Sequence, residues 1–282
     1  MRAGPLSSSE VIDLLNHYFV PVFVSMEDYE DGGSAPAAEK AEYWRIYHAA
    51  HAAKMSVGSV HVYILSPAGE PIATRHVAKA GEEGELKSLL EQTSHDLKIP
   101  RGEPLFKPTP QSVPPERAPD ALALHLVARY ARQGGSWNEF PAEDWLLLDR
   151  AEWKKLLPPS ELNEVVGSSW DIDPAVSASI LIHVYPQTEN NDVRKNRLDR
   201  QSLKATCVSV GDSVIRVRLD GQLRMKHSFY PGRDTEQFVE ATILGYVDFE
   251  RASHRIRAVR IVTDPAKYDE HAFGVAIEGP YP

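Results

Sequence analysis

Five stretches near the end of the chain decide its fold class: SLKATCVSV (residues 202–210), SVIRVRLDGQLRM (213–225), QFVEATILGYVDF (237–249), RIRAVRIVTD (255–264) and AFGVAIEG (272–279). In each stretch apolar residues alternate with polar ones, which is typical of a strand with one buried face. The connections between them are short, so consecutive strands are expected to pair antiparallel. The sequence therefore predicts a mostly antiparallel sheet, either a small barrel or a curled sandwich.

Helices are expected to precede this sheet. Residues 120–133 are predicted to form a helix that ends at Gly134-Gly135, and residues 174–185 a second one. The stretch DWLLLDRAEWKKLL (144–157) fits either a single helix or a strand followed by a helix. Together with the strands, these elements predict a helical plus antiparallel-β domain over residues 120–282.

A proline-rich stretch marks the boundary before that domain. Residues 100–119 contain seven prolines in twenty residues. Proline fixes φ and donates no backbone hydrogen bond, so neither a helix nor a central strand is expected there. We therefore expect an extended linker over 100–119 between one domain at 1–99 and another at 120–282.

The residues before the linker alternate between helical and strand patterns. Ala-rich composition and helical spacing of the apolar residues favour a long helix, and a β-branched and aromatic run, FVPVFVSM, favours a buried strand. In chain order we expect a helix (8–18), this strand (19–26), the Ala-rich helix (37–55), a hairpin (60–65 with 71–77) and a closing helix (82–97).

Parts of both domains resemble known families. SSSEVIDLLNHYFVPVFVSMED (7–28) resembles the segment that follows the redox motif in thioredoxin-like and UAS-type domains, and VHVYILSPAGEPIATR (60–75) resembles their central hairpin. Residues 215–264 resemble the β-rich region of selenoprotein N and its bacterial relatives, in which both pieces occur in one polypeptide. The resemblance implies an α+β protein: a thioredoxin-like α/β domain without its first strand and redox motif, followed by the helical and antiparallel-β domain.

The chain departs from this family at the residues that carry its chemistry. The redox pair of selenoprotein N would fall before Met1, and Ser59-Val60 stand where thioredoxins place a cis-proline. The single cysteine, Cys207, lies in an alternating strand pattern and is interpreted as a small buried hydrophobe. Because a thiol–disulfide reaction needs two thiols, we expect a non-redox binding or scaffold protein. An N-terminally truncated thiol oxidoreductase is the alternative.

Two polar stretches in the second domain form the candidate ligand or partner surface. The first, 185–202, supplies Glu189, Asn190, Asn191 and Arg194, and the second, 223–234, supplies Arg224 and His227. Arginine can clamp an anion, and imidazole can act as an acid near neutral pH. A hydrolase with its site in this domain is an alternative, as is a plain surface loop held by its own Asn and Asp side chains.

A second candidate site lies on the Ala-rich helix. His48, His51 and Met55 are spaced to share one helical face, and imidazole with thioether suits a soft metal. A metal-dependent oxidoreductase that uses these residues is therefore a further alternative, beside the interpretation that the histidines simply border an amphipathic helix.

The net charge and the absence of known catalytic motifs limit the functional classes and partners that the sequence allows. The net charge is −9 with a pI near 5.7, so no nucleic acid is expected. Residues 194–260 nevertheless hold 14 Lys and Arg against 8 Asp and Glu, which fits either the solvent face of a sheet or a surface for a protein or small anionic ligand. GxGxxG, GxxxxGK[ST], GxSxG, HExxH and CxxC are all missing. No membrane span or secretory signal is visible, so a cytoplasmic location is expected, while cofactor and oligomeric state stay open.

Overall fold

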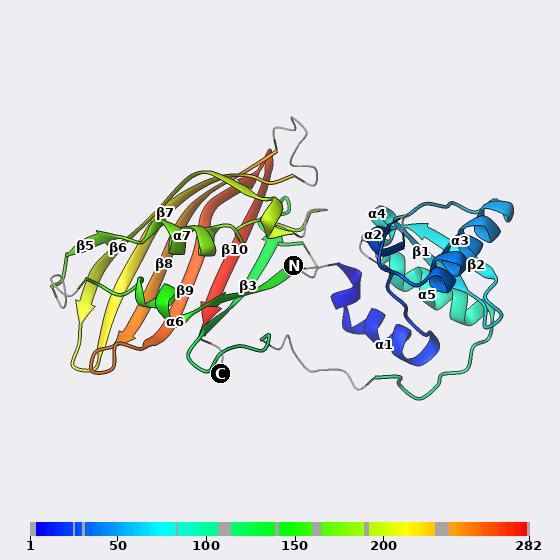
Figure 1. Cartoon of the computed structure of the whole chain (residues 1–282), viewed down its shortest axis with the longest axis horizontal. Coiled ribbons are helices and arrows are strands. Elements are labelled where there is room, and N and C mark those ends of the chain that lie inside the picture. The colour runs from blue at the N-terminus through cyan, green and yellow to red at the C-terminus, as the bar shows by residue number, and fades with distance from the viewer. Residues whose placement is uncertain are drawn as a thin grey trace. The chain divides into compact units, whose positions relative to one another are not determined.

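The structure is a computed structural model that describes residues 4–24, 26–29, 32–82, 84–106, 114–138, 141–159, 165–188, 192–228 and 237–280. The chain forms two compact units, Gly4–Pro110 and Gln111–Pro282. Each unit has its own hydrophobic core. The described residues form a mixed α+β structure with two antiparallel sheets, one in each unit (Figure 1). Among the described residues, no helix combines the length and the apolar character needed to cross a membrane.

The unit Gly4–Pro110 consists of helices and one β-hairpin. Residues of α1, β1 and α5 build its core, which contains Val11, Ile64 and Leu90. The predicted first helix, Ala-rich helix, hairpin and closing helix are all confirmed. The elements are η1 (Pro5–Ser7), α1 (Ser9–Tyr18), α2 (Met26–Tyr29), α3 (Ala37–Ala52), β1 (His61–Leu65), β2 (Pro71–His76), α4 (Val77–Ala80) and α5 (Glu85–Asp96). Whether this unit is thioredoxin-like stays a prediction.

The buried strand expected at 19–26 was wrong. Residues 19–24 belong to neither a helix nor a strand, and Val20, Val22 and Phe23 are 77%, 79% and 90% exposed. Only Phe19 packs against the core of this unit. Strand-forming composition needs a neighbouring strand to pair with, and β1 pairs with β2 instead.

The first part of the proline-rich stretch is attached to α1. The Asn16 side chain, which is 8% exposed, donates a hydrogen bond to the Phe106 carbonyl and accepts one from the Phe106 amide. Arg101 forms an ion pair with Asp13 on the same helix at 2.9 Å. The described parts of 100–119 contain no helix or strand, but residues 101–106 lie within the unit Gly4–Pro110 rather than in a free linker.

The unit Gln111–Pro282 is built on one large sheet. Its eight strands follow the order β4-β3-β10-β9-β8-β7-β6-β5, and every neighbouring pair is antiparallel. The elements are β3 (Leu122–Tyr130), β4 (Ala142–Leu148), α6 (Arg150–Lys154), β5 (Ser169–Asp171), α7 (Pro174–Leu181), η3 (Val193–Lys195), β6 (Arg197–Val210), β7 (Val214–Lys226), β8 (Phe238–Glu250), β9 (Ile256–Tyr268) and β10 (His271–Gly279).

The alternating pattern of the last five strands produces one buried face. In β7 the residues from Ile215 to Met225 are buried at every second position, and in β8 those from Val239 to Phe249. Two of these inward positions are glycines. A Cβ on Gly221 would lie 2.4 Å from the Ser202 carbonyl oxygen, and one on Gly245 would lie 2.8 Å from that of Arg260. Glycine therefore permits the close backbone approach that these strands make.

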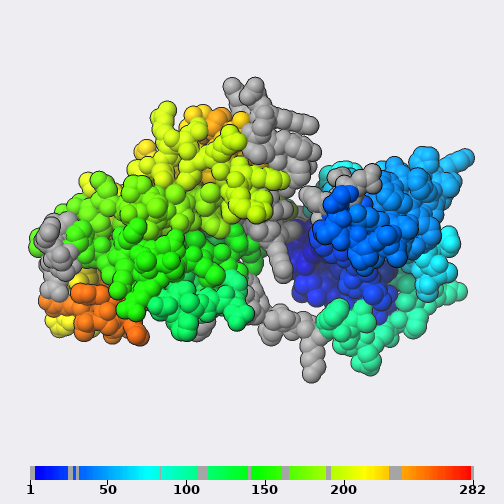
Figure 2. Space-filling view, in the orientation of Figure 1, coloured from blue at the N-terminus to red at the C-terminus, as the bar shows by residue number. Residues whose placement is uncertain are grey.

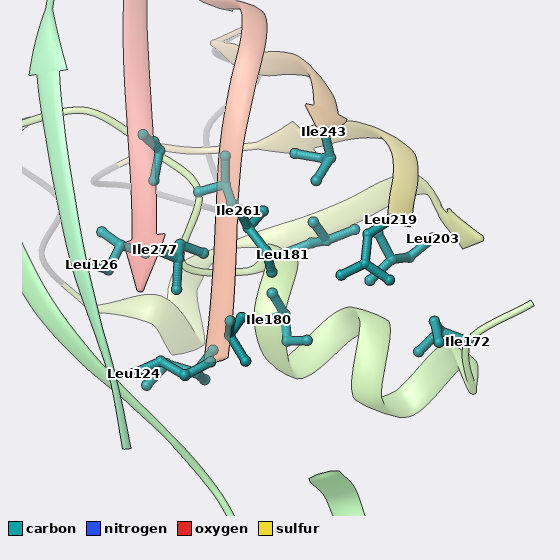
Figure 3. Close-up of a cluster of buried hydrophobic side chains, with 14 of the residues drawn as sticks. Leu124, Leu126, Ile172, Ile180, Leu181, Leu203, Leu219, Ile243, Ile261 and Ile277 are labelled. Carbon is teal, nitrogen blue, oxygen red and sulfur yellow. The ribbon is translucent and has the colours of Figure 1, made fainter. Parts of the chain in front are cut away.

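Helix α7 fills the buried face of the sheet. Asp173 caps it by accepting hydrogen bonds from the Ala175 and Val176 amides, and Pro174 begins it, so the predicted helix is confirmed. Ile180 and Leu181 point towards the strand residues Leu124, Ile261 and Ile277 (Figure 3). In the space-filling view, green and yellow-green segments make up most of the visible face of this unit (Figure 2).

Three predictions for this unit need correction or completion. The sheet is single and is not closed, so neither the barrel nor the sandwich forms. The helix expected at 120–133 is wrong, because Leu122–Tyr130 form the strand β3, with β10 and β4 paired to it on either side. Residues 144–157 adopt the strand-then-helix alternative, since β4 ends at Leu148 and Asp149 caps α6.

Candidate functional site

The two predicted polar stretches meet at His227. Its Nδ1 donates a hydrogen bond to Asn196 Oδ1 at 2.7 Å, and its Nε2 accepts one from the Thr188 hydroxyl at 2.5 Å. Asn196 in turn donates to the Ile182 carbonyl, just after α7. The stretches therefore lie side by side, as a shared site requires. Glu189, Asn190 and Asn191 lie outside the described residues.

His227 itself is an interior residue. It is 0% exposed, stacks on the Tyr185 ring at 4.4 Å, and meets Tyr268 edge-on at 5.5 Å. Burial lowers the pKa of His227 to about 4, so the ring is neutral at physiological pH. The structure thus places His227 beneath the surface, where it joins two loops and is not positioned to contact a ligand.

The two arginines of the predicted surface are already paired with acids. Arg194 is exposed and forms a bidentate ion pair with Asp192. Arg224 contacts Asp199 at 3.4 Å and Glu240 at 3.1 Å, and its guanidinium lies 4.0 Å above the Phe238 ring. These pairs match the solvent-face interpretation of the basic stretch, because each arginine is neutralised by an acid on its own or a neighbouring segment.

The predicted metal site is not assembled on one helical face. Helix α3 ends at Ala52, so Met55 lies beyond the helix that carries His48 and His51. The His48 ring stacks on Trp44 at 6.1 Å and meets Tyr47 edge-on. Within the described ranges, no group of three or more His, Cys, Asp or Glu side chains is placed to hold a metal ion.

Cys207 is a core residue of the sheet. It is 1% exposed on β6, and burial raises the pKa of its thiol. A protonated, buried thiol is a poor nucleophile. The interpretation of Cys207 as a small buried hydrophobe fits this environment.

A wide, open pocket that sequence reasoning missed lies between β4, α6 and α7. Its volume is about 410 Å³, and its walls combine apolar side chains with three polar ones. The lining residues are Leu146, Leu147, Glu152, Ala178, Ser179, Ile182 and His183. The polar residues come from two segments, with Glu152 on α6 and with Ser179 and His183 at or just after the end of α7, and no known sequence motif connects them.

Two of the polar side chains of the pocket, Glu152 and Ser179, are hydrogen-bonded to each other. Glu152 belongs to the capping box of α6: its Oε2 accepts from the Asp149 amide at 2.9 Å, while Asp149 accepts from the Glu152 amide. Its other oxygen, Oε1, accepts from the Ser179 hydroxyl at 3.3 Å. The capping pattern Asp-x-x-Glu can be identified in the sequence, whereas the proximity of Glu152 to Ser179 of α7 cannot.

His183 is oriented by a carboxylate behind it. Its Nδ1 lies 2.9 Å from Asp144 Oδ2 on β4, and both side chains are mostly buried. Burial of Asp144 opposes its ionisation, but the hydrogen bond from His183, together with weaker favourable interactions that include the Trp145 amide, holds the pKa of that carboxyl below its usual value. An ionised carboxylate on Nδ1 fixes that nitrogen as the donor and leaves Nε2 as the basic nitrogen.

Comparison with known proteins identifies no relative of this chain. No protein-family model, no curated protein and no solved structure matches the chain.

Proposed function

We propose that this chain is a binding protein with no thiol redox chemistry of its own, and that its β unit binds a small ligand in the pocket between β4, α6 and α7. The observation that carries the proposal is the pocket, whose volume of about 410 Å³ falls in the range of small-molecule sites. Its composition also fits, because such sites combine apolar walls with a few placed polar groups.

The charge of the pocket selects the ligand. Glu152 lines it, and the carboxylate of Asp144 lies directly behind His183. Two carboxylates repel an anion, so the expected ligand is neutral or cationic, with an apolar part against Leu146, Leu147 and Ile182. A small anionic ligand, which the basic stretch suggested, does not suit this pocket.

The lack of thiol chemistry rests on Cys207, the one cysteine of the sequence. Its burial in β6 and raised thiol pKa disfavour the thiolate that disulfide exchange needs. The resemblance to selenoprotein N then supports a shared fold and ancestry without the thiol activity of that family. A scaffold role for the unit Gly4–Pro110 belongs to the same proposal.

Ligand-detected NMR tests the pocket. The probe is a panel of small neutral and cationic amides and amines that includes N-phenylbutanamide. We expect saturation transfer to at least some members of the panel, and its loss in Ala178→Trp, which fills the pocket. Ala175→Trp is the matched control, since Ala175 is exposed on the same helix and does not line the pocket.

Two results would overturn the proposal. One is a panel without any binding at millimolar concentration. The other is binding that Ala178→Trp and Ala175→Trp affect equally, because the ligand would then lie elsewhere.

A further inference from the structure

We infer that this pocket hydrolyses small neutral or cationic carboxylic esters, with His183 as the general base and Asp144 as the residue that positions it. The inference rests on the proposed function, because the ester must first occupy the pocket. The observation behind it is the juxtaposition of an oriented imidazole, a hydroxyl and apolar side chains in one open pocket.

In this geometry Nε2 of His183 is available to a substrate that binds in the pocket. Nδ1 is engaged with Asp144 Oδ2 at 2.9 Å, and the ring lines the cavity. In the part of the chain that the structure describes, Nε2 of His183 has no hydrogen-bond partner. A base of this kind needs one nitrogen fixed by an acceptor and the other within reach of a proton donor.

Ser179 supplies a hydrogen-bond donor for the carbonyl oxygen of the ester. Its hydroxyl lies 3.3 Å from Glu152 Oε1, which is long for an O–H···O bond. Such a bond is weak, so the hydroxyl can turn from Glu152 to the developing oxyanion at small cost. Donors aimed at an oxyanion lower the barrier of acyl transfer.

The reaction balances with water alone as the second substrate. His183 Nε2 takes a proton from water while the water oxygen bonds to the carbonyl carbon and the carbonyl electron pair moves to oxygen. The pair then returns, the bond from carbon to the alcohol oxygen breaks, and that oxygen takes the proton from the imidazolium. The products are a carboxylic acid and an alcohol, and His183 is neutral again.

The surroundings of the pocket set the substrate class. Glu152 and Asp144 disfavour an anionic ester, while Leu146, Leu147 and Ile182 favour an apolar acyl or alcohol group. The acid product ionises near neutral pH and is then repelled by the same carboxylates, which assists its release. The expected substrate is therefore an ester of a short apolar acid.

Phenyl butyrate is the test substrate, and phenol release is the readout. A positioned general base contributes about 100- to 10,000-fold. We expect His183→Gln to lower the rate of the purified full-length chain by at least tenfold, and Ala178→Trp to abolish saturable hydrolysis. His125→Gln should leave the rate unchanged. His125 is the matched control because it also pairs with a carboxylate, Glu143, on β3 and β4 but does not line the pocket.

Asp144→Asn tests the positioning role through the separate values of kcat and KM. The asparagine amide can donate to Nδ1 and so favour the tautomer that carries its proton on Nε2, which cannot take a proton from water. We therefore expect kcat to fall at least tenfold while KM for phenyl butyrate stays unchanged. A purely structural role of Asp144 would change KM instead, because the pocket itself would be altered.

The outcomes separate this inference from the proposed function. Binding of N-phenylbutanamide that Ala178→Trp removes, together with phenyl butyrate hydrolysis no faster than in His183→Gln, overturns the inference and leaves the binding function standing. Hydrolysis that survives Ala178→Trp overturns the inference, because the reaction would occur elsewhere. Loss of panel binding overturns the proposed function as well. Thermal unfolding of each variant confirms that it is folded.

Discussion

His227 shows how one buried side chain can make stability depend on pH. Its ring has Tyr185 on its face, Tyr268 at its edge, and hydrogen bonds to Thr188 and Asn196. Burial lowers the pKa of His227 to about 4 in the folded chain, whereas an unfolded histidine titrates near pH 6.5. Below pH 6.5 the unfolded state therefore binds a proton that the folded state does not.

Protonation of the unfolded state therefore destabilises the folded chain as the pH falls below 6.5. The free energy of unfolding should fall as pH decreases from 6.5 to 4, by about 3 kcal/mol for this residue. In His227→Gln this part of the slope should disappear, although the variant starts from lower stability at pH 7. Urea unfolding at several pH values, followed by tryptophan fluorescence, measures both slopes.

The control for this experiment is His271→Gln, an exposed histidine at the start of β10. Its slope should equal that of the unsubstituted chain. Equal slopes in His227→Gln and His271→Gln would contradict the burial of a neutral His227.

Some contacts of the candidate site could be predicted from the sequence, and others could not. The nearness of the 185–202 and 223–234 stretches was expected, and the hydrogen bonds of His227 bear it out. The pair of Asp144 and His183 was not expected, because 39 residues separate them and only the docking of α7 beside β4 brings them together. No periodicity or spacing in the chain carries that information.

The segments 19–24 and 122–130 show the same limit for whole elements. In β3, Leu122, Leu124 and Leu126 point inward with period two, but the intervening Ala123 and Val127 are also apolar. This composition fits a helix as well as a strand, and only the pairing with β10 and β4 selects the strand. The last five strands were predictable because their polar and apolar positions alternate cleanly.

The exposed segment 19–24 gives a direct test of the structure. Val22 and Phe23 are 79% and 90% exposed, so Val22→Asp and Phe23→Ser should each change the free energy of unfolding by less than about 0.5 kcal/mol. Urea unfolding measured by circular dichroism checks this. Leu90→Asp, in the core of the same unit, is the contrasting variant and should prevent folding of that unit. A loss of about 2 kcal/mol or more in Val22→Asp would show that the segment is a buried strand after all.

The two separate cores lead to a prediction for the chain as a whole. One core joins α1, β1 and α5, and the other joins the large sheet to α7. Leu90 is 2% exposed in the first, and Leu219 is 0% exposed in the second. Truncating either leucine to alanine removes packed methyl groups and leaves a cavity, at a cost of about 2–5 kcal/mol.

Two spectroscopic signals can assign each cost to its unit. Four of the five tryptophans lie after residue 111, so fluorescence reports chiefly the sheet unit, whereas α1, α3 and α5 give the unit Gly4–Pro110 most of its helical signal at 222 nm. We expect Leu219→Ala to lower the urea midpoint of the fluorescence transition alone. Leu90→Ala should lower that of the 222 nm transition alone. If either substitution moved both transitions equally, the chain would unfold as one cooperative structure, and two independent cores would be the wrong description.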